Sequence, residues 1–65
     1  MFDPSEPTEA ELLAARSVPL EALRAKAKHR ANQLGDPLQD VSALIMAVHA
    51  EKIYQYEVQR RREAL

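Results

Sequence analysis

The run Ala43–Val48 constrains the fold of this chain more than any other feature, because it holds no polar side chain for almost two helical turns. It lies inside the longest stretch without glycine or proline, where a single helix is expected. A helix that is apolar on one stripe needs one neighbour, whereas a helix that is apolar all round must be enclosed. We therefore expect this helix to be covered on more than one side.

The chain has 65 residues, which make one domain at most and leave little material to enclose such a helix. Chains of this size bury only about 60% of their unfolded surface and usually depend on disulfides, a metal or oligomerisation. The absence of cysteine excludes disulfides and thiolate metal sites, and it fits a reducing compartment. Oligomerisation is therefore the expected source of the missing burial.

The N-terminal part is expected to form an arm and a short helix. Two prolines keep residues 1–7 extended. Thr8 and Glu11 then match a capping box, in which each residue satisfies a backbone amide of the other. We expect a helix over residues 9–16, and the sequence leaves open whether the arm and this helix pack on the same chain or on a neighbouring copy.

Two longer helices are expected to follow and to form an antiparallel hairpin. The second spans residues 19–34, with a proline in its first turn and Gly35 as its stop. Asp36 caps a third helix over residues 37–63, and the short joint between the two helices makes them antiparallel. The sequence thus predicts an all-α fold with a single helical domain over residues 8–65.

Apolar residues spaced three and four positions apart define the expected seam of this hairpin. Alanines in the second helix would allow the two backbones to approach closely. The expected hairpin core consists of Leu20, Leu23, Ala27, Ala31, Leu34, Leu38, Val41, Ile45 and Val48.

Apolar residues outside this seam are expected to form a surface for association. Burying Leu44 and Met46 would contribute about 1.5–3 kcal/mol each. Two hairpins packed through such faces would form a two-fold dimer of the four-helix-bundle type, so a second copy or another protein is the expected partner. The expected association interface consists of Leu44, Met46, Ala47, Ala50, Ile53, Tyr54 and Val58.

Charge is segmented along the chain although the net charge is only −1. Residues 1–15 hold four acidic residues and no base, residues 16–34 are mainly basic, residues 35–58 are mildly acidic, and an arginine triplet follows. This alternation would let antiparallel segments, or antiparallel copies, attract each other.

A dimeric nucleic-acid-binding regulator is the alternative function. The cationic side chains that could contact nucleic acid have a second, structural interpretation. They can cover an apolar seam with their stems, or stabilise the C-terminus of a helix, and we favour this structural interpretation. The possible nucleic-acid contacts are Arg24, Lys28, Arg60, Arg61 and Arg62.

Patterns typical of catalysis or of cofactor binding are not found in the sequence. The two histidines, His29 and His49, fall on different predicted helices, and no carboxylate stands at metal-ligand spacing from them. Gly35 is the only glycine, so no glycine-rich loop exists to hold a phosphate. We expect no enzymatic activity, no cofactor, no metal and no small-molecule substrate.

The sequence also lacks the patterns of export and membrane insertion. Residues 1–4 have neither the basic residues nor the apolar core of a signal peptide, and no apolar run approaches the roughly 18 residues of a membrane span. We expect a soluble, cytoplasmic chain without a membrane partner, of a size typical of small bacterial or phage regulators. Its expected role is non-enzymatic protein–protein interaction, as an adaptor, inhibitor or assembly factor.

Overall fold

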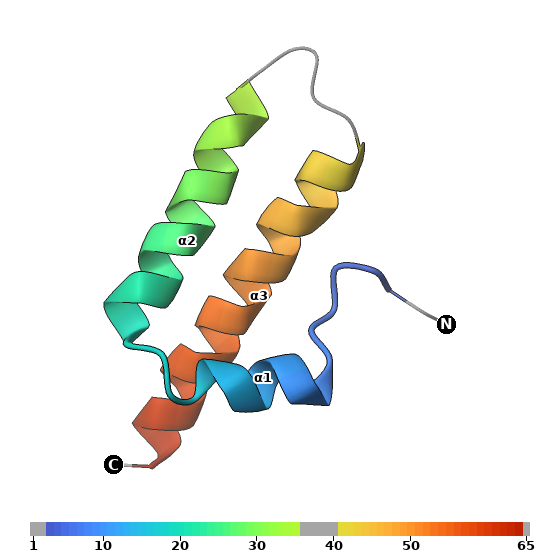
Figure 1. The fold of residues 1–65 in the computed structure, drawn as a ribbon. Helices are drawn as coiled ribbons and strands as arrows, with labels where there is room; N and C mark the ends of the chain where they lie inside the picture. Colours follow the sequence, from blue (N-terminus) through green and yellow to red (C-terminus); the bar gives the residue numbers. More distant parts are fainter. Residues whose placement is uncertain (1–2, 36–40, 65) are drawn as a thin grey trace.

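A computed structural model describes residues 3–35 and 41–64 of the chain. These residues form three helices and no β-strand, which confirms the prediction of an all-α chain. The helices are α1 (Glu9–Ala15), α2 (Leu20–Asn32) and α3 (Val41–Glu63), and a short 3₁₀ turn over Gln33–Gly35 follows α2 (Figure 1).

The capping box begins α1 where the sequence places it. The Thr8 hydroxyl accepts a hydrogen bond from the Glu11 amide at 3.2 Å, and the Glu11 carboxylate accepts one from the Thr8 amide at 2.9 Å. Both residues satisfy amides that the first helical turn leaves without an intrahelical partner. Because α1 has only seven residues, this cap supplies a large share of its local stability.

The ends of α2 differ slightly from the predicted ones. Pro19 precedes the helix as its N-cap, and its carbonyl accepts the amides of Ala22 and Leu23 at 3.0 and 3.2 Å. The α-helical geometry ends at Asn32, and no described residue takes a positive φ angle. The predicted cap at Asp36 and the first residues of the third helix lie outside the described residues.

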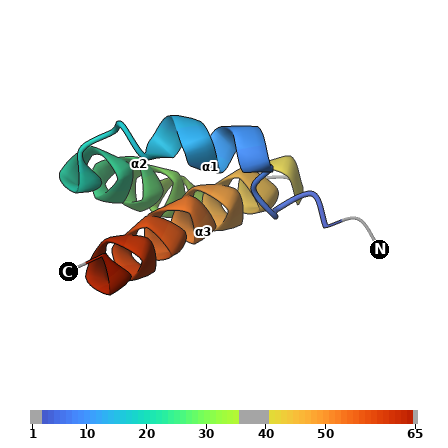
Figure 2. The same ribbon diagram turned by 90° about the horizontal axis from the view of Figure 1, so that it is seen from below.

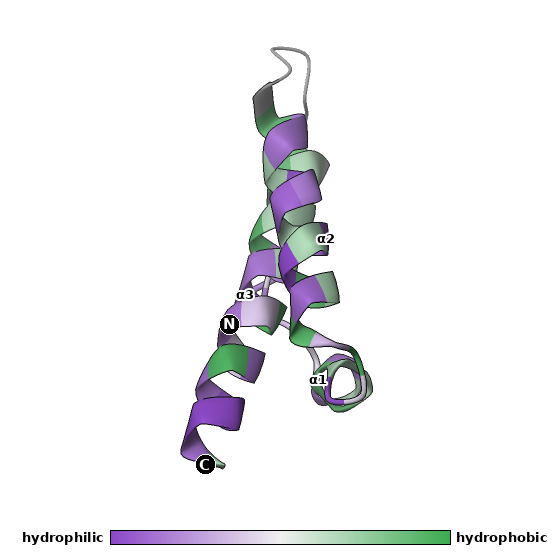
Figure 3. Ribbon diagram, turned by 90° about the vertical axis from the view of Figure 1, so that its left-hand side faces the viewer, coloured by the Kyte–Doolittle hydropathy of each residue, from purple (hydrophilic) through white to green (hydrophobic). Residues whose placement is uncertain are grey.

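The helices α2 and α3 run side by side in opposite directions and form one layer (Figure 1). The helix α1 crosses one side of this layer near the start of α2, and the arm of residues 3–8 runs beside the edge of α3 that faces away from α2 (Figures 1, 2 and 3). The described chain extends 42 × 29 × 16 Å. The fold therefore consists of a helical pair with a partial second layer on one side.

The hydrophobic core lies where the three helices meet. Ala15 of α1, Leu23 of α2 and Ile53 of α3 are buried together, with Tyr54 packed against them. Beyond this point, the contact between α2 and α3 is made through alanines. Small side chains let the two backbones approach closely, and Ala27, Ala47 and Ala50 are only 4–5% exposed.

The stripe of α2 that meets α3 follows the predicted spacing over most of its length. Leu23 and Ala27 are buried, and Leu20 and Leu34 are half-buried. Ala31 differs from the prediction, because it is exposed at the edge of the seam.

The face of α3 that meets α2 differs more from the predicted one. Val41 is 70% exposed and Val48 is 36% exposed. Both were predicted to lie in the core, and neither does. Three residues assigned to an association surface, Ala47, Ala50 and Ile53, are instead buried within the chain.

The reason is that α3 carries two overlapping apolar stripes. Burying the valine stripe would remove more apolar surface from water, whereas the alanine stripe permits a closer approach of the two backbones. The alanine stripe is the one that faces α2. Ile45, also predicted for the core, is half-buried, and Leu38 lies outside the described residues.

The arm is fixed to α3 of the same chain. The Lys52 ammonium group contacts oxygens of Asp3, Ser5 and Glu6 at 3.2, 3.2 and 3.0 Å. The Tyr56 hydroxyl donates a further hydrogen bond to the Glu6 carboxylate. Ser5 is only 9% exposed. Of the two placements left open by the sequence, the structure has the arm and α1 packed within the same chain.

The C-terminal end of α3 is tied to the joint between α1 and α2. Glu57 is 2% exposed and accepts two hydrogen bonds from Arg60, at 2.9 and 3.0 Å, and one from Arg61 at 3.1 Å. Arg61 also donates to the Val18 carbonyl at 2.7 Å. Arg61 thus connects the buried carboxylate to the segment that orients α1.

None of the helices in the described part of the chain has both the length and the apolar composition that crossing a membrane requires.

Candidate protein–protein interface

The helix α1 covers part of one side of the α2–α3 layer, and the arm lies along the outer edge of α3. The other side of the layer is covered by no helix of the described chain (Figures 2 and 3). We call this second side the uncovered face. A groove of about 300 Å³ runs along it between the two helices. The residues that line the groove are Ala27 and Ala31 from α2, Leu34 from the 3₁₀ turn after it, and Ala47, Val48, Glu51 and Lys52 from α3.

The wall of the groove that α3 supplies continues outward as a stripe of aliphatic side chains. Val41, Leu44 and Val48 follow each other at spacings of three and four residues, so they lie on one side of the helix. Their exposed fractions are 70%, 49% and 36%. Single exposed apolar residues are ordinary, but a continuous apolar patch marks a surface for interaction.

The uncovered face is bordered by opposite charges on its two edges. Arg24 and Lys28 stand three residues before Ala27 and Ala31, so they lie on the α2 edge. Glu51 lies on the α3 edge, where it accepts a hydrogen bond from Gln55 at 2.8 Å. In the described part of the chain, none of the three charged groups forms an ion pair.

The predicted interface residues Leu44 and Met46 lie on opposite sides of α3. Met46 lines a second hollow, of about 350 Å³, together with Lys26 and Arg30, and Pro4 of the arm closes its edge. The Arg30 guanidinium lies 4.0 Å from the Met46 sulfur. Leu44 therefore belongs to the uncovered face, whereas Met46 belongs to the side that the arm partly covers.

The last two predicted interface residues, Tyr54 and Val58, are half-buried. Tyr54 packs against the core cluster. It also lines a small hollow with Leu20 and Arg24 at the end of the helical pair where α2 begins. Among the seven predicted interface residues, Leu44 therefore combines a large aliphatic side chain with an exposed position on the uncovered face.

The five predicted nucleic-acid contacts are divided between two places. Arg24 and Lys28 border the uncovered face, and the arginine triplet lies in the last turn of α3. Arg60 and Arg61 both bind Glu57. Their geometry agrees with the interpretation that favours a structural role for the triplet.

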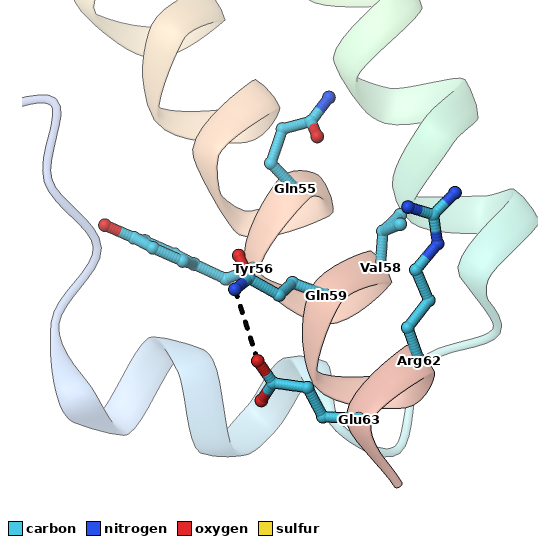
Figure 4. A pocket seen from close by; sticks show the side chains of 6 residues that line it. All are labelled: Gln55, Tyr56, Val58, Gln59, Arg62 and Glu63. Carbon is cyan, nitrogen blue, oxygen red and sulfur yellow. Dashed lines mark hydrogen bonds between the residues drawn. The ribbon is translucent and has the colours of Figure 1, made fainter. Parts of the chain in front are cut away.

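A hollow of about 520 Å³ beside the C-terminal part of α3 is a weaker candidate site (Figure 4). All of its lining residues come from α3, and Gln59 donates a hydrogen bond to Glu63 at 3.2 Å across it. Figure 4 shows Tyr56 pointing toward the arm, while Val58 and Arg62 point away from it. Because small-molecule sites surround their ligand, a surface on one helix supplies too few contacts.

Several ionisable groups of the described residues are engaged in structural contacts. Hydrogen bonds from Arg60, and then from Arg61, lower the pKa of Glu57. The backbone amide of Thr8 lowers the pKa of Glu11, and so does His49, whose Nε2 lies 2.9 Å from the Glu11 carboxylate.

No group of three or more His, Asp or Glu side chains with metal-binding geometry occurs among the described residues.

The sequence analysis missed the roles of Lys52, Tyr56 and Glu57. The segmented charge indicated that the acidic N-terminus would find a basic partner, but it did not single out Lys52 in a mildly acidic stretch. Glu57 resembles any solvated glutamate on a helix, and only its spacing of three and four residues from two arginines indicated a paired carboxylate.

Comparison with known protein families, with curated proteins and with solved structures found no match to this chain.

Proposed function

We propose that this chain is a non-enzymatic protein–protein interaction module that works through its uncovered face. The observation that carries the proposal is the continuity of the groove between α2 and α3 with the exposed stripe of Val41, Leu44 and Val48. Apolar surface of this kind gains stability when another chain removes it from water.

Two further features support an interaction role. The described residues form a thin layer whose second layer covers one side only, whereas stable domains usually bury both sides of such a layer. The helical groove also has the form that receives a partner helix through residues spaced three and four positions apart.

The absence of cysteine from the chain makes a labelling experiment possible. A Val48→Cys variant carries its thiol on the uncovered face, and an Ala25→Cys variant carries a matched thiol on an exposed position of α2 away from the seam. The rate of alkylation is measured for the dilute purified protein, for the concentrated protein and for the protein within the cells of its source.

We expect the thiol at position 48 to be protected at least about tenfold in the associated state, whereas the thiol at position 25 reacts at one rate throughout. If both positions react equally fast in every sample, the uncovered face binds nothing and the proposed function is wrong.

A further inference from the structure

The charges at the edges of the uncovered face indicate which partner it takes, provided that the proposed interaction function holds. An interface between identical copies related by a two-fold axis uses the same patch twice, so the patch must be complementary to itself. Arg24 and Lys28 lie along the α2 edge of the uncovered face, and Glu51 lies along the α3 edge. Lys52 also lines the groove beside Glu51, but its ammonium group is already paired with Asp3 and Glu6. Among the described residues, the charges without an ion pair are therefore cationic on one edge and anionic on the other, with apolar residues between them. A patch of this composition meets the requirement.

We infer that the partner is a second copy of this chain, stacked face to face so that α2 of each copy lies over α3 of the other. The axis then runs parallel to the helices. In this arrangement, Glu51 of one copy lies beside Arg24 and Lys28 of its partner, and the pairing occurs twice.

The levels of these residues along the helical pair agree with this arrangement. Glu51 lines the same groove as Ala27 and Ala31, which lie within one turn of the two cations on α2. A two-fold axis parallel to the helices keeps every residue at its own level. Glu51 therefore reaches the cations of the other copy without any shift along the axis.

The other two-fold stacking is disfavoured by the same charges. If the axis ran across the helices, α2 would lie over α2 of the second copy, and Arg24 and Lys28 would face the same cations. Like charges held together oppose association, whereas opposite charges favour it and fix the orientation.

The packing surface also suits two identical copies. Alanines at positions 27, 31 and 47 keep the middle of the face shallow, while Leu44 and Val48 project from the α3 edge. In the proposed stacking, Leu44 and Val48 of one copy lie over Ala31 and Ala27 of the other, inside its cationic edge. Large residues then meet small ones, as close packing requires.

Charge reversal tests the inference with purified protein alone. The dissociation constant of the dimer is measured by sedimentation equilibrium for the wild type, for Lys28→Glu, for Glu51→Lys and for the double variant. Each single reversal replaces two attractive contacts by two repulsive ones, so we expect it to weaken the dimer about tenfold. The double variant restores the attraction between positions 28 and 51 with its sign inverted, although the unchanged Arg24 still lies beside the new lysine. Its dimer should therefore be about threefold tighter than that of either single variant.

The control variant Lys26→Glu changes an equally exposed cation of α2 beside the other hollow, and it should leave the dissociation constant unchanged. Circular dichroism verifies that every variant keeps its helical content. A wild type that is monomeric at all concentrations overturns the inference, as does a double variant no tighter than the single ones. Protection of the thiol at position 48 within cells would still uphold the proposed function in either case.

Discussion

Glu57 has a carboxylate that is almost completely removed from water at 2% exposure, and its surroundings explain how this is tolerated. A buried charge is costly unless it is paired and hydrogen-bonded. Arg60 supplies two parallel donors to the carboxylate, and Arg61 supplies a third. Arg61 also donates a hydrogen bond to the Val18 carbonyl. The Glu57–Arg61 ion pair therefore fixes the end of α3 against the joint before α2, in addition to neutralising the buried charge.

Replacing Glu57 by glutamine keeps the shape of the side chain but removes its charge and turns one acceptor into a donor that faces two arginines. We expect the free energy of unfolding of Glu57→Gln to fall by about 1–3 kcal/mol, since charge-assisted hydrogen bonds are lost in a buried place. Chemical denaturation followed by circular dichroism measures the change.

The matched control for this substitution is Glu63→Gln in the last turn of α3. Glu63 is exposed and accepts a hydrogen bond from Gln59 alone, so its substitution should change the free energy of unfolding by less than about 0.5 kcal/mol. Equal effects of the two substitutions would show that Glu57 does not have the buried position described.

The arm of residues 3–8 is an element without a helix, and its order depends on hydrogen bonds and charge. Hydrogen bonds from the Ser5 hydroxyl and amide, followed by the contact with Lys52, lower the pKa of Asp3 to about 2. A hydrogen bond from Tyr56, followed by Lys52, lowers the pKa of Glu6. Both carboxylates therefore favour the docked arm in their charged form.

The sign of these shifts predicts that acid releases the arm. A carboxylate whose pKa is lower in the docked state stabilises that state above its ordinary pKa, and the stabilisation is lost as the pH falls through the lowered value. We expect Asp3 to titrate with a midpoint near pH 2 in the whole chain and at a higher pH in a peptide of residues 1–8, which keeps Ser5 but lacks Lys52. Carboxyl chemical shifts in nuclear magnetic resonance spectra report both midpoints.

A Lys52→Met variant separates the two causes of the Asp3 shift. The midpoint should rise only in part, because the hydrogen bonds from Ser5 contribute more than Lys52 does. If Asp3 titrates alike in the chain and in the peptide, the arm is not docked on α3 in solution.

At the level of whole elements, local chemistry made the helix ends predictable and left the orientation of α3 undetermined. A proline and a capping box mark a helix end by their own geometry, so α1 begins after Thr8 as expected. The rotation of α3 depends on which of two stripes meets α2. Alanines carry little hydrophobic signal, and the charge of Glu57 interrupts the stripe that is buried.

The same ambiguity limited the prediction of the candidate site. Leu44 lies on the uncovered face as expected of an interface residue, but Val41 and Val48 were assigned to the core. One arrangement of α3 would bury valines and the other buries alanines, and the choice depends on the fit between the backbones, which no periodicity reports.

On the scale of the whole molecule, the shape of the chain and its charge pattern lead to the same expectation. The described residues extend only 16 Å in their thinnest direction, against 42 Å in the longest. A second layer exists where α1 crosses, at one end and on one side (Figure 2). A second copy on the uncovered face would complete a bundle of four long helices with the alternating charges in contact.

A dimer that forms through this face makes thermal stability depend on concentration. Association stabilises the folded state by mass action, so we expect the melting temperature of the wild type to rise steadily over about a hundredfold increase in protein concentration. Val48→Asp replaces an apolar side chain on the α3 edge of the uncovered face by a carboxylate and should remove this dependence, because the contact loses apolar burial and must take a charge out of water. Leu13→Asp changes a side chain of α1 that is 53% exposed and lies away from this face, and the dependence should persist. Calorimetric scans of the three proteins at matched concentrations decide the matter, since a wild-type melting temperature that stays constant is the behaviour of a monomer.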